Sequence, residues 1–134
     1  MISKPFRTLA TLTALTLAVS GLNSTLAAAE DDAYPKKNPL AGDEEAIQKG
    51  LKLYFKWCVA CHGAHADGVS RFGDYGADLR KFWRGYPDFV RIVLNGVTDR
   101  QMPPWGGVLD EDEISQIGAY LETLQLEGAR WEGY

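Results

Sequence analysis

The chain has 134 residues, a formal net charge of −4 and 46% hydrophobic residues, and it contains two cysteines and two histidines. This length suits one small domain, and an acidic balance without a basic run argues against nucleic-acid binding. Residues 49–100 carry nine Lys or Arg against five Asp, whereas residues 101–134 carry one Arg against seven acidic residues. We expect a mixed, solvated surface, with the alternative that the basic middle segment steers an acidic partner.

Residues 1–29 have the composition of a secretory signal peptide. Lys4 and Arg7 supply a positive start, residues 9–19 form an uncharged, largely apolar run, and small residues precede the acidic residues 30–32. The run is shorter than the roughly 20 residues that a membrane-spanning helix needs. We therefore expect cleavage near Ala29 and export to the periplasm, with an uncleaved anchor as the alternative. No later segment is expected to span a membrane.

Residues 30–42 are polar, contain two prolines and show no period. They are expected to be a flexible N-terminal segment ahead of a single domain over residues 43–134. The first helix is predicted to begin at the acidic residues 43–45, which suit the positive end of a helix dipole. Apolar residues then recur at helical spacing and lead directly into the cysteines. They are Ile47, Leu51, Tyr54, Phe55 and Cys58.

The middle of the chain predicts a loop and two shorter helical segments. Residues 63–76 hold four glycines and no period, which indicates a loop, and residues 78–83 predict a short helical turn. Pro87 suits the first turn of a helix over residues 88–94, and Gly96 suits its end. A second loop is expected to follow this helix.

The last helix has the clearest predicted start. Asp110 is its expected N-cap, Glu113 is the capping-box partner, and Leu109 is expected to pack against Ile114. Its predicted buried face consists of Ile114, Ile117, Tyr120, Leu121 and Leu124. Because no strand pattern appears anywhere, the sequence predicts an all-α fold.

Both cysteines and both histidines lie between Cys58 and His65, in the motif Cys58-Val-Ala-Cys61-His62. C-x-x-C-H is the signature of covalent haem attachment. Two thiols one helical turn apart can each add to a vinyl group on one edge of the porphyrin, with the adjacent His62 beneath the iron. A thioredoxin-like pair would need a βαβ context, which this sequence does not show. A zinc site would need two more ligands, and no Cys or His outside this segment could supply them. A disulfide between the cysteines is permitted in an exported protein but leaves His62 unexplained.

A second axial ligand decides what such a haem would do. Met102 lies in the second loop, residues 97–107, where Pro103 and Pro104 stiffen the backbone. Its thioether is expected to bind the iron on the face opposite His62, although methionine in a small core is often plain packing. Two filled axial sites favour electron transfer over binding of O₂ or peroxide. His65 follows His62 too closely to reach the opposite face and is expected to be exposed.

Two further sets of residues have open roles. Trp105 is a candidate haem contact, through its ring or its indole N–H, with core packing as the equal alternative. Asp67, Asp74 and Asp78 could ligate calcium, but they lack the ordered spacing of a known calcium loop, so calcium is the minor alternative.

Taken together, these motifs resemble those of bacterial class I cytochromes c. The resemblance extends to Gly50 and Tyr54, which precede Cys58 by eight and four residues, and to Ile117 and Tyr120 on the last helix. In that family, these positions lie where the first and last helices cross. The resemblance covers about residues 43–127 and implies one domain wrapped around a single covalent haem c.

The chain departs from the family after the haem motif. Class I cytochromes c commonly have Gly-Pro-x-Leu there, and the proline carbonyl accepts the hydrogen bond of the proximal histidine. This chain has Gly76-Ala77-Asp78-Leu79, and without the proline the sequence leaves the acceptor of His62 open, with the carbonyl of Ala77 as a candidate. That bond sets the ring orientation and the ligand basicity.

A finer resemblance implies a partner. The stretches CHGAHADG and NGVTDRQMPPWG are similar to those of cytochromes, including the cytochrome c-L type, that accept electrons from periplasmic quinoprotein alcohol or methanol dehydrogenases, which use pyrroloquinoline quinone. The resemblance implies a monomeric electron carrier, not an enzyme, that passes electrons on to a downstream cytochrome or oxidase. The alternatives are a carrier of another respiratory pathway and a haem enzyme or gas sensor with an open sixth coordination site.

Overall fold

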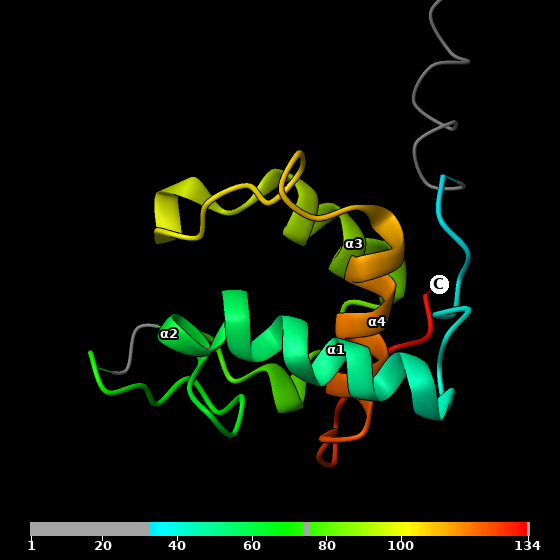
Figure 1. Ribbon diagram of the computed structural model, residues 1–134, viewed down its shortest axis with the longest axis horizontal. Helices are drawn as coiled ribbons and strands as arrows, with labels where there is room; N and C mark the ends of the chain where they lie inside the picture. Colours follow the sequence, from blue (N-terminus) through cyan, green and yellow to red (C-terminus); the bar gives the residue numbers. More distant parts are fainter. Residues whose placement is uncertain (1–32, 74–75, 134) are drawn as a thin grey trace, which may run out of the picture.

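The computed structural model describes residues 33–73 and 76–133, so the predicted signal peptide, residues 1–29, lies outside the described chain. The described residues form helices joined by loops (Figure 1). In chain order they are α1 (Glu44–Trp57), α2 (Val59–His62), η1 (Leu79–Lys81), α3 (Tyr86–Asn95), η2 (Thr98–Arg100) and α4 (Glu111–Glu122). Their extended pairs are three isolated bridges and no strand, which confirms the all-α prediction.

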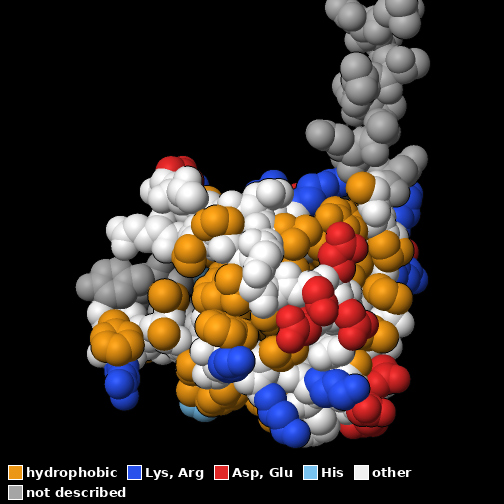
Figure 2. Space-filling model, turned by 45° about the horizontal axis from the view of Figure 1, so that its top comes forward, with side chains coloured by type: hydrophobic (Ala, Val, Ile, Leu, Met, Phe, Trp, Pro, Cys, Tyr) orange, Lys and Arg blue, Asp and Glu red, His pale blue; other side chains and the backbone are white. Residues whose placement is uncertain are grey.

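Both long helices that frame the domain begin at the predicted caps. The Asp43 carboxylate accepts a hydrogen bond from the Ala46 amide at 2.7 Å and caps α1. Asp110 and Glu113 form the predicted capping box of α4, with bonds of 2.8 and 3.1 Å between side chains and backbone amides. These bonds satisfy amides that have no partner within the helix, and the acidic side chains suit the positive end of its dipole. On one face of the molecule, several acidic side chains gather in a group, and Lys and Arg side chains lie next to it (Figure 2).

The first and last helices cross where the sequence predicts. Gly50 of α1 lies directly against the α4 backbone, and a Cβ atom there would contact the Gln116 carbonyl group and come within 3.0 Å of the Ile117 amide nitrogen. One turn further along α1, the fully buried Tyr54 packs on Tyr120 with ring centroids 5.4 Å apart. The glycine therefore sets the separation of the two backbones, and the tyrosine pair fills the adjoining space.

Helix α4 is buried on more sides than its apolar pattern predicts. Besides Ile114, Ile117, Tyr120 and Leu121, its Ser115, Gln116, Gly118 and Ala119 are also buried, whereas the predicted Leu124 is only partly buried. The reason is that three parts of the chain surround the helix. Tyr86 of α3 bonds to the Ser115 hydroxyl at 2.7 Å, and the Asn38 amide donates to the Ser115 carbonyl at 2.9 Å. In contrast, Phe55, one of the apolar residues predicted at helical spacing in the first helix, is 47% exposed.

Residues 33–42, within the segment expected to be flexible, contact the domain. Asn38 is buried against α4, and the Lys36 carbonyl accepts a bond from the Gly133 amide at 2.7 Å. Lys37 forms an exposed ion pair with Glu132 at 3.3 Å. The two ends of the described chain therefore meet. No helix in the described ranges is long and apolar enough to cross a bilayer.

Candidate cofactor site

The two cysteines lie on one turn at the end of α1. Helix α1 ends at Trp57, and Cys58 joins it to α2, where the amides of Cys61 and His62 donate to the Cys58 carbonyl at 3.2 and 3.0 Å. Neither thiol is in a disulfide. Cys61 is exposed, whereas burial, together with the nearby Cys61, raises the pKa of the Cys58 thiol to about 12. The Cys58 thiol of the folded chain is therefore protonated at neutral pH.

The ring of His62 is oriented by the backbone carbonyl of Ala77, the acceptor that the sequence left open. Its Nδ1 lies 3.0 Å from the Ala77 oxygen. A carbonyl only accepts, so Nδ1 carries the proton and Nε2 keeps a free lone pair. Burial lowers the pKa of His62, and the bond to Ala77 opposes this effect in part. The imidazole is thus held as the neutral tautomer that a metal ion requires.

Close backbone contacts hold that carbonyl in place, and the sequence did not reveal them. Gly76 passes so near the cysteine turn that a Cβ there would lie 2.9 Å from the Cys61 carbonyl carbon and 3.0 Å from the His62 Cα. On the other side of the turn, the Tyr54 hydroxyl donates to the Gly63 carbonyl at 2.6 Å. The pattern of four glycines was the available signal, but it indicated only a loop.

Met102 lies in a loop that is bonded to the end of α3. The amides and carbonyls of Val97 and Met102 exchange two hydrogen bonds of 2.9 and 3.1 Å, and the Trp105 amide donates to the Val93 carbonyl at 3.0 Å. Gly96 has φ +70°, and a Cβ there would lie 2.6 Å from the Met102 oxygen, so this turn requires glycine. The Met102 side chain packs against the core but stays partly exposed.

The structure brings the cysteine turn and the methionine loop to the same end of the molecule (Figure 1). Trp105 packs on Trp57, the residue before Cys58, with ring centroids 5.6 Å apart. His65 is exposed on the loop that follows the cysteine turn, as predicted. The contact of Trp57 with Trp105 joins two segments far apart in the sequence, and the sequence did not predict it.

The residues at this end fit a covalent haem. Several apolar side chains pack on the core without being covered, and they come from the cysteine turn, η1 and the segment around Met102. They are Trp57, Cys58, Val59, Leu79, Leu94, Met102 and Trp105. A large apolar ring would remove such side chains from water. The donor set is equally suitable, because it offers two free thiols, a neutral imidazole with Nε2 available and a thioether.

The aspartates considered for calcium have other bonds. Arg80 binds both carboxylate oxygens of Asp78, at 2.9 and 3.0 Å, and the Val69 amide donates to Asp67 at 3.0 Å. Asp74 lies outside the described residues. Over residues 33–73 and 76–133, no three His, Cys, Asp or Glu side chains form a group that could hold a metal ion.

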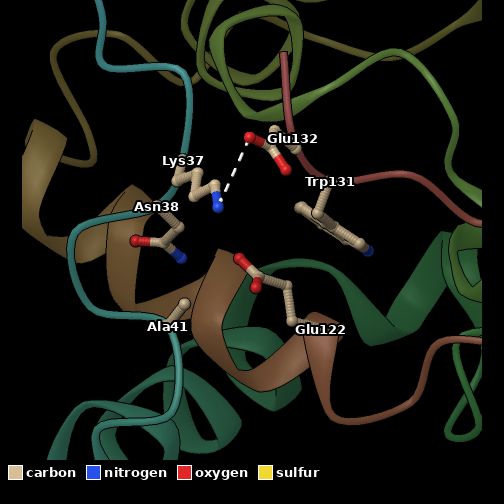
Figure 3. A pocket seen from close by; sticks show the side chains of 6 residues that line it. All are labelled: Lys37, Asn38, Ala41, Glu122, Trp131 and Glu132. Atoms are coloured by element: carbon tan, nitrogen blue, oxygen red, sulfur yellow. Dashed lines mark ion pairs between the residues drawn. The ribbon is translucent and has the colours of Figure 1, made fainter.

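A separate pocket lies between the two ends of the described chain (Figure 3). It is lined by Lys37, Asn38, Ala41, Glu122, Trp131 and Glu132. One carboxylate oxygen of Glu122 is buried and has no hydrogen-bond partner within the described chain. Burial raises the pKa of Glu122, and the Asn38 amide opposes this effect. The Trp131 indole nitrogen, also buried without such a partner, points away from the pocket (Figure 3).

Comparison with known proteins places this geometry among cytochromes. The family model for cytochrome c oxidase, cbb3-type, subunit III matches residues 45–121. The chain is 33% identical over 105 residues to a quinohaemoprotein alcohol dehydrogenase of Pseudomonas putida, a match that spans 75% of this chain but only 14% of that protein. It is 28% identical to cytochrome c550 of Pseudomonas aeruginosa, over 72% of this chain and 68% of that one.

A solved structure is similar as well. Cytochrome CL from the marine methylotroph Methylophaga aminisulfidivorans superposes with a TM-score of 0.55 at 28% identity, covering 65% of this chain and 60% of that one. The likeness extends the sequence match to the arrangement of the helices.

Proposed function

Because the chain belongs to the cytochrome c family, we propose that it carries single electrons in the periplasm on one haem c, attached through Cys58 and Cys61. His62 and Met102 are the proposed axial ligands of the iron. Residues 1–29 are the proposed signal peptide, and the protein acts as a monomer without catalysing a chemical conversion. The family membership and the free cysteine pair support this proposal.

The bound haem would supply a one-electron couple between ferric and ferrous iron. The protein's part is to hold both axial groups in the same place in either state. The bond from His62 Nδ1 to Ala77 fixes the imidazole, and the Val97 pairing with Met102 fixes the loop that carries the thioether. Fixed ligands keep the structural change on electron transfer small, and a filled sixth position excludes small molecules.

The orientation of His62 by the Ala77 carbonyl is the observation that carries this proposal, because a backbone-bonded neutral imidazole next to two thiols is what a proximal haem ligand needs. The test is the spectrum of the purified ferric protein. It should show covalent haem and the weak red band of methionine–iron ligation, and Met102→Ala should abolish that band. Rapid CO binding by the untreated ferrous protein would contradict it and favour an open sixth site.

The proposed electron donor is a periplasmic quinoprotein alcohol dehydrogenase. The support is the 33% identity to a segment of a quinohaemoprotein alcohol dehydrogenase and the similarity to cytochrome CL of a methylotroph. Its own pyrroloquinoline quinone would deliver electrons to this chain, and a downstream cytochrome or oxidase would remove them. The test is whether a periplasmic quinoprotein alcohol dehydrogenase, supplied with alcohol, reduces the purified cytochrome. Met102→Ala is the control variant.

A second assignment has its own support, because the matching family model describes a subunit of a cbb3-type oxidase, which takes up electrons. In that case the chain would carry electrons in another respiratory pathway. The two assignments differ in one measurement. Rapid reduction by dehydrogenase plus alcohol favours the first, whereas reduction only by the respiratory chain of isolated membranes favours the second.

A further inference from the structure

We propose that Trp57 and Trp105, here called the tryptophan pair, act as positioning residues that keep the methionine loop closed over the iron. The inference rests on the proposed axial role of Met102. It assigns a function to Trp57, and it gives Trp105 a role through Met102.

The pair connects the two segments that supply the ligands. Trp57 immediately precedes Cys58, and Trp105 is the third residue after Met102. Their ring centroids are 5.6 Å apart at an interplanar angle of 58°, which lies within the favourable range for aromatic pairs. Both rings pack against the core and remain partly exposed. The Lys56 ammonium also lies 4.5 Å from the Trp57 ring centroid, within cation–π distance.

The other bonds of the methionine loop do not make this connection. The pairing of Val97 with Met102 lies within the loop, and the bond from the Trp105 amide to Val93 ties the loop to α3. Helices α1 and α3 each pack against α4. The loop can therefore keep its own hydrogen bonds while its distance from the cysteine turn changes. The tryptophan pair joins the methionine loop directly to the last residue of α1 and so restricts this distance.

Because the loop is stiff, a displacement of the Trp105 ring is expected to displace the Met102 sulfur. Pro103 and Pro104 separate Met102 from Trp105 and restrict the backbone between them. A displacement of the Trp105 ring therefore moves the Met102 backbone with it. Loss of the ring contact should raise the fraction of molecules in which the thioether has left the iron.

Competition by imidazole measures that fraction. An added ligand binds the ferric iron only when Met102 has left, so its apparent affinity rises in proportion to the open population. Since an aromatic pair contributes about 0.5–1.5 kcal/mol beyond its buried area, Trp57→Ala and Trp105→Ala should each bind imidazole about two- to tenfold more tightly. The double variant should show no further increase, because either change removes the same contact. Trp57→Phe should restore most of the wild-type affinity.

Trp83→Ala is the matched control, because Trp83 is 60% exposed and lies outside the cysteine turn and the methionine loop. It should leave the imidazole affinity unchanged. The far-UV circular dichroism of all variants should match the wild type, which separates positioning from loss of fold. The inference is overturned if the imidazole affinities of Trp57→Ala and Trp105→Ala equal that of Trp83→Ala, or if their effects add. Absence of the methionine–iron band in the wild type would instead contradict the proposed function.

Discussion

At the scale of single residues, backbone atoms hold the candidate proximal ligand. His62 bonds to the Ala77 carbonyl, and the chain reaches that position because Gly76 has no side chain to strike the Cys61 carbonyl. The resemblance of Gly-Ala-Asp-Leu to the family's motif made Ala77 a candidate acceptor but left the acceptor open, and the structure supplies it. The sequence could not predict why Gly76 is needed, because the close approach joins residues fifteen positions apart and leaves no local pattern.

Gly76→Ala tests the close approach. The added Cβ would meet the Cys61 carbonyl and displace Ala77, and such overpacking costs about 1–3 kcal/mol. The free energy of unfolding, measured with urea, should fall by that amount, and the His62 ring resonances of the ferric protein should shift. Gly107→Ala is the control, because that Cβ would meet nothing within 4 Å and only its φ of +89° opposes the change. Unchanged His62 resonances in Gly76→Ala would contradict the argument.

Glu122 gives the protein a predicted pH dependence. Burial raises its pKa in the folded chain, so the folded state binds a proton more readily than the unfolded one. The resulting stabilisation is complete below the unfolded pKa and is lost as pH rises through the folded pKa. Glu122→Gln, which cannot ionise, should therefore be more stable than the wild type at neutral pH, and the difference should shrink on acidification.

Urea unfolding of both proteins across that pH range is the measurement. Glu127→Gln is the control, because Glu127 is an exposed glutamate away from the buried site of Glu122. A difference between Glu122→Gln and wild type that stays constant with pH would show that the buried carboxylate does not titrate in this way.

At the scale of elements, the helix ends and the crossing followed from local patterns, whereas the burial of each face did not. Asp43, Asp110 and Glu113 cap their helices through neighbours within three residues, so the sequence predicts them directly. The apolar period of α4 identified buried residues correctly but not all of them, because Asn38 and Tyr86 come from distant segments and bury Ser115 as well. The exposure of Phe55 likewise depends on which elements cover α1.

Gly50→Ala tests the crossing of α1 and α4. Alanine favours a helix by about 1 kcal/mol over glycine, but here the Cβ would press on the α4 backbone, which cannot rotate away as a side chain can. We expect a net loss of about 1–3 kcal/mol in the free energy of unfolding. Gln48→Ala, at an exposed position of the same helix, should be neutral or slightly stabilising. A stabilised Gly50→Ala would contradict the close crossing.

Asp110→Ala tests the start of α4. Loss of the carboxylate leaves the Glu113 amide without its bond, which costs about 1 kcal/mol. Thermal unfolding should occur at a lower temperature, and Asp110→Asn, which keeps an oxygen in the same place, should recover most of the loss. Equal loss in both variants would argue against a capping role.

At the scale of the whole molecule, the haem should act as part of the core. Without the haem, the partly buried apolar side chains around Cys58 and Met102 stay exposed to water. A Cys58→Ser, Cys61→Ser double variant, which cannot attach haem, should therefore unfold at a much lower temperature and bind a hydrophobic dye. An unfolding temperature equal to that of the haem-loaded protein would contradict this role.

The crossing of α1 and α4 also bears on the order of assembly. Helix α1 carries the attachment turn near its end, but it gains its packing surface only after α4, near the end of the described chain, has formed. In the folded domain, burial raises the pKa of the Cys58 thiol to about 12, so little thiolate is present at neutral pH. We therefore expect the proposed haem to be attached before the last helix docks, and docking then to close the domain around it.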